Sequence, residues 1–230
     1  SFPRALTLAA ISGLASYHET MESQMRSAAE AEKLAAKESI RKMGLSLKEE
    51  MLEWDLAMQS HDMTFNMLMP NFLRYSLIVL LFLVVENKLE ELANVAEQTH
   101  PKSPTAPDPK RCVIKTYKRY FTEEVGISSL DWQTMDELNA IRNCIVHASG
   151  KVQGRPDETL LRNIANKHKG LSVSNTRQFS RIDLRPLYLE DDMLVIEPSY
   201  CSYIIDRVRR FFEQLCDALQ LPDLITETDS

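Results

Sequence analysis

The apolar run from Ser76 to Val85 constrains the fold of this chain more than any other stretch. It contains no charged residue and is bounded by Arg74 and Glu86. Its length is about half of the roughly 20 residues that a helix needs to cross a bilayer. The run therefore predicts a buried core helix rather than a membrane anchor, and we expect the other elements to pack around it.

Helical periodicity upstream of this run predicts a hairpin. Residues 5–42 form an Ala-rich pattern with spacings of three and four that ends at Gly44. Ser46 and Glu49 then make a capping box for a second helix, residues 47–61. Because the link between the two helices is so short, we expect them to be antiparallel.

Downstream patterns are again mainly helical. Pro70 suits the first turn of a third helix, which extends to about Gln98. Further helices are expected at residues 110–125, 156–169 and 198–219. Short runs rich in β-forming residues predict a small hairpin or an extended flap from Leu171–Val173, Leu187–Leu189 and Met193–Ile196.

These elements predict a mainly all-α protein. We expect a helical bundle with a long N-terminal helical hairpin and a small β-hairpin or flap before the last helix. Residues 1–65 are assigned to the N-terminal hairpin or arm, residues 66–220 to the bundle, and residues 221–230 to an acidic tail.

The charge is distributed unevenly along the chain. Residues 1–100 carry 9 Lys and Arg against 14 Asp and Glu, a net charge of −5. Residues 101–210 carry 18 against 14, a net charge of +4, and the last twenty carry 0 against 5. The basic middle region is where an anionic partner is expected to bind.

Cysteine and histidine spacing predicts neither a metal site nor a cofactor. The five histidines are far apart, and with six glycines in the chain we find no Gly-rich phosphate loop. The four cysteines, scattered and without a secretory signal, suit a reducing compartment, so a cytoplasmic protein is expected: Cys112, Cys144, Cys201 and Cys216.

The best candidates for catalytic or ligand-binding residues lie in residues 136–150, whose pattern predicts one helix. Arg142 falls inside its apolar stripe, where a guanidinium is costly unless it is paired or lines a cavity. Asn143 and His147, four residues apart, lie together beside that stripe. The stripe itself consists of Met135, Leu138, Ile141, Ile145 and Val146.

The ends of this helix also have sequence signals. Thr134 and Glu137 suggest a capping box at its start. Gly150 is expected to stop it, since glycine accepts the left-handed conformation common at helix C-termini.

The segment from Arg142 through Asn143 to His147 resembles the signature of the HEPN (higher eukaryotes and prokaryotes nucleotide-binding) superfamily. The resemblance covers roughly residues 66–219 and includes an apolar, Glu-containing helix upstream, residues 76–93. It implies a metal-independent endoribonuclease whose active site forms across a homodimer. It also suggests a toxin or phage-defence effector, with an antitoxin or another protein as a further partner.

The motif residues fit cleavage of RNA through the ribose 2′-hydroxyl. His147 suits general acid and base catalysis because imidazole titrates near neutrality. Arg142 suits charge stabilisation at a phosphate, and Asn143 suits orientation of the imidazole or of a phosphate oxygen. Glu86, which follows the apolar run, is a candidate partner for Arg142, in a pair as well explained by structure as by catalysis.

Helix geometry separates the two main catalytic candidates. Five steps along a helix place Arg142 and His147 about 140° apart. Either the helix unwinds before His147, or a second copy of the chain brings another motif to the same cleft. The second arrangement is the one that the resemblance implies, so we expect a homodimer.

Two alternatives remain open from the sequence. The first is a non-catalytic HEPN-like module that binds nucleotides or acts as a scaffold, and the second is an unrelated helical protein that binds a partner. For an RNA substrate, one basic helix face is the candidate for tracking the backbone, although a solvated face is the default reading. Its residues are Arg111, Lys115, Lys118 and Arg119.

Overall fold

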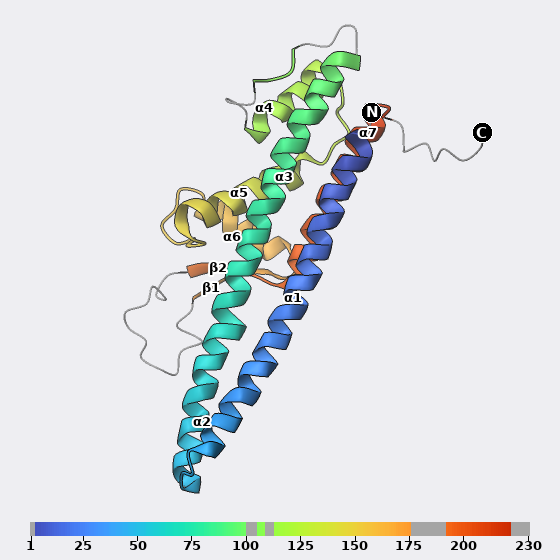
Figure 1. Cartoon of the computed structure of the whole chain (residues 1–230). Coiled ribbons are helices and arrows are strands. Elements are labelled where there is room, and N and C mark those ends of the chain that lie inside the picture. Colours follow the sequence, from blue (N-terminus) through green and yellow to red (C-terminus); the bar gives the residue numbers. More distant parts are fainter. Residues whose placement is uncertain (1–2, 100–104, 109–112, 176–191, 222–230) are drawn as a thin grey trace, which may run out of the picture.

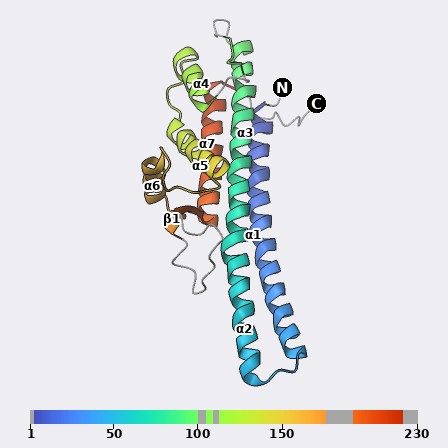
Figure 2. The same cartoon turned by 90° about the vertical axis from the view of Figure 1, so that its left-hand side faces the viewer.

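The computed structural model describes residues 3–99, 105–108, 113–175 and 192–221, and it is mainly helical, as the sequence predicts. Helix α1 (Pro3–Lys42) runs antiparallel to α2 (Leu47–His61) and to the helix that continues from it. Together they form a rod, and the shorter elements pack against its upper half (Figures 1 and 2). The predicted hairpin is confirmed, including the capping box of Ser46 and Glu49.

No loop separates the second and third helices. A π-helical segment (Asp62–Leu68) joins α2 to α3 (Met69–Thr99). Proline inside a helix donates no N–H and clashes with the carbonyl four residues back. The wider π turn before Pro70, in which the Met69 N–H bonds to Thr64 O, accommodates it. The expected boundary between residues 65 and 66 thus falls within a helical segment, and the division of the chain stays a prediction.

The other described elements complete the bundle. Strands β1 (Leu171–Asn175) and β2 (Asp192–Ile196) pair antiparallel, with Leu171 opposite Ile196, which confirms a small β-hairpin before the last helix. The expected strand at 187–189 lies outside the described residues, as does the tail beyond Leu221. The remaining helices are α4 (Ile114–Arg119, followed by a π-helical turn, Tyr120–Glu124), α5 (Trp132–Ala148), α6 (Glu158–Lys167) and α7 (Pro198–Ala218).

The hydrophobic core forms between α3, α5 and α7. The inner face of α3 is fully shielded. The aromatic ring of Trp132 on α5 packs edge-on against Phe211 on α7, with 4.9 Å between the ring centres. Burial of each such side chain contributes roughly 1.5–3 kcal/mol. The inner face of α3 consists of Leu77, Ile78, Leu81, Phe82, Val85, Leu89 and Leu92.

The outer face of α3 departs from the sequence prediction. Leu80 is 40% exposed and Leu83 is 50% exposed, so the expectation of a buried helix is right for one face and wrong for the other. The run is continuously apolar because both faces of α3 are apolar. Only the inner face packs in the core. By length and composition alone, the described stretch Leu47–Gln98 is apolar enough to cross a membrane, and 39% of its apolar window is buried.

One largely shielded arginine joins α1 to the bundle. Arg74 on α3 donates two hydrogen bonds to the carboxylate of Glu22 on α1, from Nε at 2.7 Å and from Nη2 at 3.1 Å. Its Nη1 donates to the carbonyl of Ile196 at the end of β2, at 3.0 Å. The guanidinium therefore fixes the relative positions of α1, α3 and β2.

We expect Gly150→Ala to lower the free energy of unfolding by about 2 kcal/mol or more, because strain and overcrowding add. Gly150 has a φ of 86°, and a Cβ there would collide with the hydroxyl of Tyr75. Gly154→Ala is the matched control, since Gly154 has a φ of 75° but open space around it. Urea denaturation of both variants measures the difference, and equal losses would contradict the role of the Tyr75 contact.

Candidate functional site

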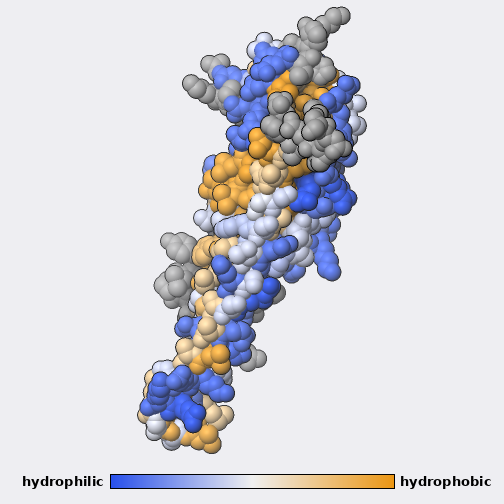
Figure 3. Space-filling view, turned by 45° about the vertical axis from the view of Figure 1, so that its right-hand side comes forward, coloured by the Kyte–Doolittle hydropathy of each residue, from blue (hydrophilic) through white to orange (hydrophobic). Residues whose placement is uncertain are grey.

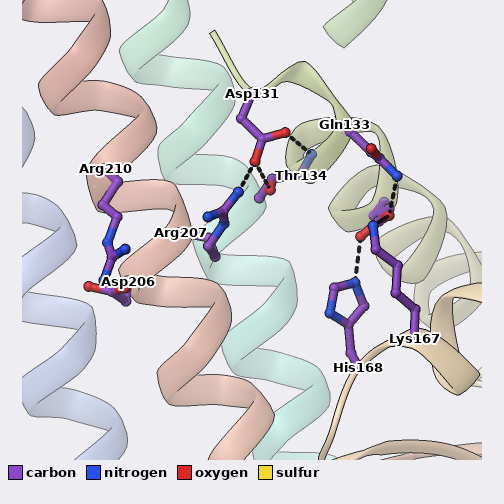
Figure 4. A network of polar contacts seen from close by, with 9 residues as sticks. Asp131, Gln133, Thr134, Lys167, His168, Asp206, Arg207 and Arg210 are labelled. Atoms are coloured by element: carbon purple, nitrogen blue, oxygen red, sulfur yellow. Dashed lines mark hydrogen bonds and ion pairs between the residues drawn. The ribbon is translucent and has the colours of Figure 1, made fainter.

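Helix α5 begins three residues earlier than the sequence suggested, at Trp132 rather than after a cap at Thr134. Its cap is Asp131, whose carboxylate accepts hydrogen bonds from the backbone N–H and the hydroxyl of Thr134, and from Arg207 on α7 (Figure 4). The expected capping box of Thr134 and Glu137 is therefore wrong. Burial alone would raise the pKa of Asp131, but the hydrogen bonds from Thr134 and Arg207 outweigh it and lower that pKa.

Glu137 instead joins α5 to the end of α6. Its carboxylate accepts hydrogen bonds from Lys167 and from Nε2 of His168, both at 2.7 Å (Figure 4). Burial would raise the pKa of Glu137, but these two partners overcome that effect and lower it. The side chain of His168 is only 9% exposed, and its ring packs against Tyr200.

The apolar stripe of α5 is confirmed except at its end. Met135, Leu138, Ile141 and Ile145 are buried, whereas Val146 is 46% exposed. Val146 precedes His147 in the last turn of α5, and His147 is also exposed. The C-terminal end of the motif thus presents both an apolar and a titratable side chain at the surface.

Arg142 is half-buried where α5 packs against α3. Its guanidinium lies over the ring of Phe82, 5.1 Å from the ring centre, an arrangement that favours a cation. Nη1 donates a hydrogen bond to Oδ1 of Asn143 at 2.9 Å. Nε is buried and has no hydrogen-bond partner among the described residues, which leaves one shielded donor unused.

A second amide extends this contact along α5. Nδ2 of Asn143 donates to Oδ1 of Asn139 at 3.3 Å, so Asn139, Asn143 and Arg142 form a chain of hydrogen bonds. Sequence reasoning missed Asn139 and Phe82. Asn139 precedes Asn143 by four residues, which is the spacing of neighbours on one helix face and was a usable signal.

Glu86 and Arg142 interact through their charges rather than through a direct bond. In the part of the chain described, no hydrogen bond or close ion pair joins them. Burial raises the pKa of Glu86, and the nearby positive charge of Arg142 opposes that rise without cancelling it. The expected pairing is thus a through-space interaction, and it leaves the guanidinium open to another anion.

His147 lies at the exposed end of α5. Helix α5 is continuous to Ala148, so the helix does not unwind before His147, and that alternative is excluded. About 140° around the helix and ~7.5 Å along it therefore separate the two motif side chains. Neither a hydrogen bond nor an ion pair from the described residues holds the imidazole, which stays available to a ligand.

The turn after His147 is firmly anchored. Ser149 adopts a left-handed conformation with a φ of 51°, and Gly150 follows at 86°, as the predicted helix stop requires. The Tyr75 hydroxyl donates to the carbonyl of Leu194, and the Leu194 N–H donates to the Gly150 carbonyl at 2.9 Å. The backbone that carries His147 is therefore fixed between α3 and β2.

The expected basic face is only partly available. Lys115 is exposed, but Lys118 forms an ion pair with Asp136 at 2.9 Å and Arg119 pairs with Glu124 at 3.7 Å. Arg111 lies outside the described residues. Asp136 precedes Arg142 by six residues, so Lys118 contacts α5 roughly 9 Å along the axis from the motif.

Neither metal ligands nor known relatives add to this picture. Within residues 3–99, 105–108, 113–175 and 192–221, no group of three or more His, Cys, Asp or Glu side chains is placed to hold a metal ion. No protein-family model, curated protein or solved structure matches the chain. The resemblance to HEPN proteins therefore stays a prediction carried by the motif.

We expect Glu137→Gln to lower the free energy of unfolding at pH 7 by about 1–3 kcal/mol, because it removes a shielded, charge-assisted contact. The folded pKa of Glu137 is below its unfolded value. Its stabilising effect is therefore present above about pH 4.3 and is lost as pH falls through the folded pKa. Urea denaturation from pH 7 to pH 3 should show a shallower pH dependence in the variant.

The control for this prediction is Asp136→Asn. Asp136 also pairs with a lysine, but its side chain is 41% exposed, so its loss should cost little. A Glu137→Gln protein with the pH dependence of the wild type would contradict the assignment of this contact.

Proposed function

We propose that this chain is a metal-independent endoribonuclease of HEPN type. The observation that supports it best is the state of Arg142, whose guanidinium is held by Phe82 and Asn143 while its shielded Nε donor has no partner among the described residues. A purely structural arginine is expected to satisfy its donors or to close an ion pair. A phosphate oxygen is a suitable acceptor for that donor.

The proposed reaction transfers the phosphate within the RNA strand. One His147 imidazole accepts the proton of the 2′-hydroxyl, whose oxygen attacks the adjacent phosphorus. The bond from phosphorus to the 5′-oxygen breaks, and a protonated imidazole donates a proton to that leaving oxygen. Arg142 stabilises the negative charge that develops on the phosphate oxygens. The products are a 2′,3′-cyclic phosphate and a 5′-hydroxyl.

The reaction needs a separate acid and base, and the intact α5 carries one histidine. Because His147 and Arg142 point about 140° apart on one helix, a single copy does not aim both at one phosphate. A homodimer that places two motifs about one cleft supplies both roles. A toxin or phage-defence activity in the cytoplasm, restrained by an antitoxin or another protein, is the biological role consistent with such an enzyme.

A non-catalytic HEPN-like module that binds nucleotides or acts as a scaffold is the second candidate. The ion pairs of Lys118 and Arg119 with carboxylates favour this candidate, because they leave less positive charge to bind an RNA backbone. Such a module binds a mononucleotide at Arg142 but leaves RNA intact.

His147→Ala and Arg142→Ala should each reduce RNA cleavage by about 10²–10⁴-fold, because each removes a group used in the transition state. The assay follows labelled RNA in excess chelator and identifies cyclic phosphate ends. A 2′-deoxy nucleotide at the cleaved position should block the reaction, since DNA lacks the attacking hydroxyl. Rates should peak at intermediate pH, where one imidazole is neutral and the other protonated.

Arg210→Ala is the matched control for Arg142→Ala, because Arg210 is 62% exposed on α7 and, among the described residues, pairs with Asp206 alone. It should cleave at the wild-type rate. Thermal unfolding of all variants separates catalysis from folding. Cleavage of the 2′-deoxy substrate, or wild-type rates for His147→Ala, would reject the mechanism and favour the nucleotide-binding module.

A further inference from the structure

The outer face of α3 carries an exposed apolar stripe with a regular spacing. Phe72 is 65% exposed, Leu83 is 50% exposed, and Met69 and Leu80 are each 40% exposed. Together with the exposed Ser76 they form what we call the α3 stripe: Met69, Phe72, Ser76, Leu80 and Leu83. Hydrophobic surface is also visible in Figure 3, as a patch on the upper half of the molecule and smaller spots along the hairpin.

The spacing of the α3 stripe is that of a helix-packing seam. Its members follow at intervals of three, four, four and three residues, which keep them on one face of the helix, where they can pack against a second helix. The sequence of intervals is the same in both directions about Ser76. An antiparallel second helix, related by a two-fold axis at Ser76, therefore matches large side chains with large ones and serine with serine.

The charge on this face also favours a second copy over a different protein. Between Asp62 and Glu86 the only charged residue is Arg74, and its side chain is 14% exposed and held by Glu22. Specific pairing between different helices usually depends on flanking charges that attract one partner and repel others. The α3 stripe has no available charge with which to select a different protein. For the same reason, two copies of the stripe do not repel each other.

The exposed area is sufficient for a stable dimer. Four large side chains with 40–65% exposure present roughly 100 Å² each. Their sum of about 400 Å² is close to the apolar part of a standard interface, which buries ~800 Å² per partner and is a little over half apolar. Val146, 46% exposed at the end of the motif, adds to it if the interface extends to α5.

From these observations we propose that two copies of this chain pair through their α3 stripes, across a two-fold axis at Ser76. This contact goes beyond the proposed catalysis, because it depends on α3 alone and is present whether or not RNA is cleaved. Leu83 in the stripe follows Phe82, whose ring carries Arg142, but consecutive helical residues point about 100° apart, so the stripe does not include the motif contact.

The first test is sedimentation equilibrium at tens of micromolar without RNA. The wild type should be dimeric, and Phe72→Glu and Leu80→Glu should weaken dimerisation by about 30-fold or more, as expected when a charge enters the centre of an apolar interface. Leu160→Glu is the matched control, because Leu160 is 50% exposed on α6 and should leave the dimer intact. Unchanged circular dichroism shows that each variant folds.

The second test is disulfide formation under mild oxidation, with Cys112 replaced by serine. Ser76→Cys should form a reducible covalent dimer. Ser202→Cys should not; Ser202 is likewise an exposed helical serine that bonds to the carbonyl four residues back. A monomeric wild type, or a dimer that tolerates both glutamate variants, would overturn the proposal.

One outcome would identify a competing occupant of the stripe, and another would separate this contact from the proposed enzyme. A monomer that co-sediments with phosphatidylcholine vesicles, and no longer does so as Phe72→Glu, would replace the second copy with a membrane surface. A dimer lost in Phe72→Glu but with no RNA cleavage in the wild type would uphold this contact and reject the proposed enzyme.

Discussion

The structure depends on the burial of one face of α3. Its inner side chains, from Leu77 to Leu92, form the centre of the core, and α5, α7 and the upper part of α1 are positioned by contact with it. Arg74 adds direction to this non-directional force, because its bonds to Glu22 and Ile196 allow one register between α1, α3 and β2. A largely shielded guanidinium is tolerated there because its donors meet acceptors on two different elements.

Local signals predicted the helices well, because caps, glycines and periodicity act within a few residues. Ser46 with Glu49, and the left-handed turn at Gly150, are where the sequence placed them. Contacts between distant residues were not predictable in this way. The pairing of Asp131 with Arg207 and of Glu137 with His168 joins residues 76 and 31 positions apart, so no spacing rule reveals either contact. The same limit explains why the exposed side of α3 was read as buried.

The candidate site was predictable in its members and not in their surroundings. Arg142, Asn143 and His147 were selected as candidates from their order along one helix, and all three lie on α5, where Arg142 contacts Asn143 and His147 faces elsewhere. Phe82 was not recognised, because an aromatic residue within an apolar run has no signal of its own until α3 is placed against α5. Charge on the basic face was overestimated for a similar reason, since Asp136 neutralises Lys118 from another helix.

The protonation of Glu86 should depend on whether an anion is bound at Arg142. Burial raises the pKa of Glu86, while the charge of Arg142 favours the ionised form. An anion that binds Arg142 cancels part of that favourable charge, so Glu86 then holds its proton more tightly. A neutral Glu86 no longer repels the anion or competes for the guanidinium. Phosphate binding and protonation of Glu86 should therefore reinforce each other, which is a property that a permanently closed ion pair would not have.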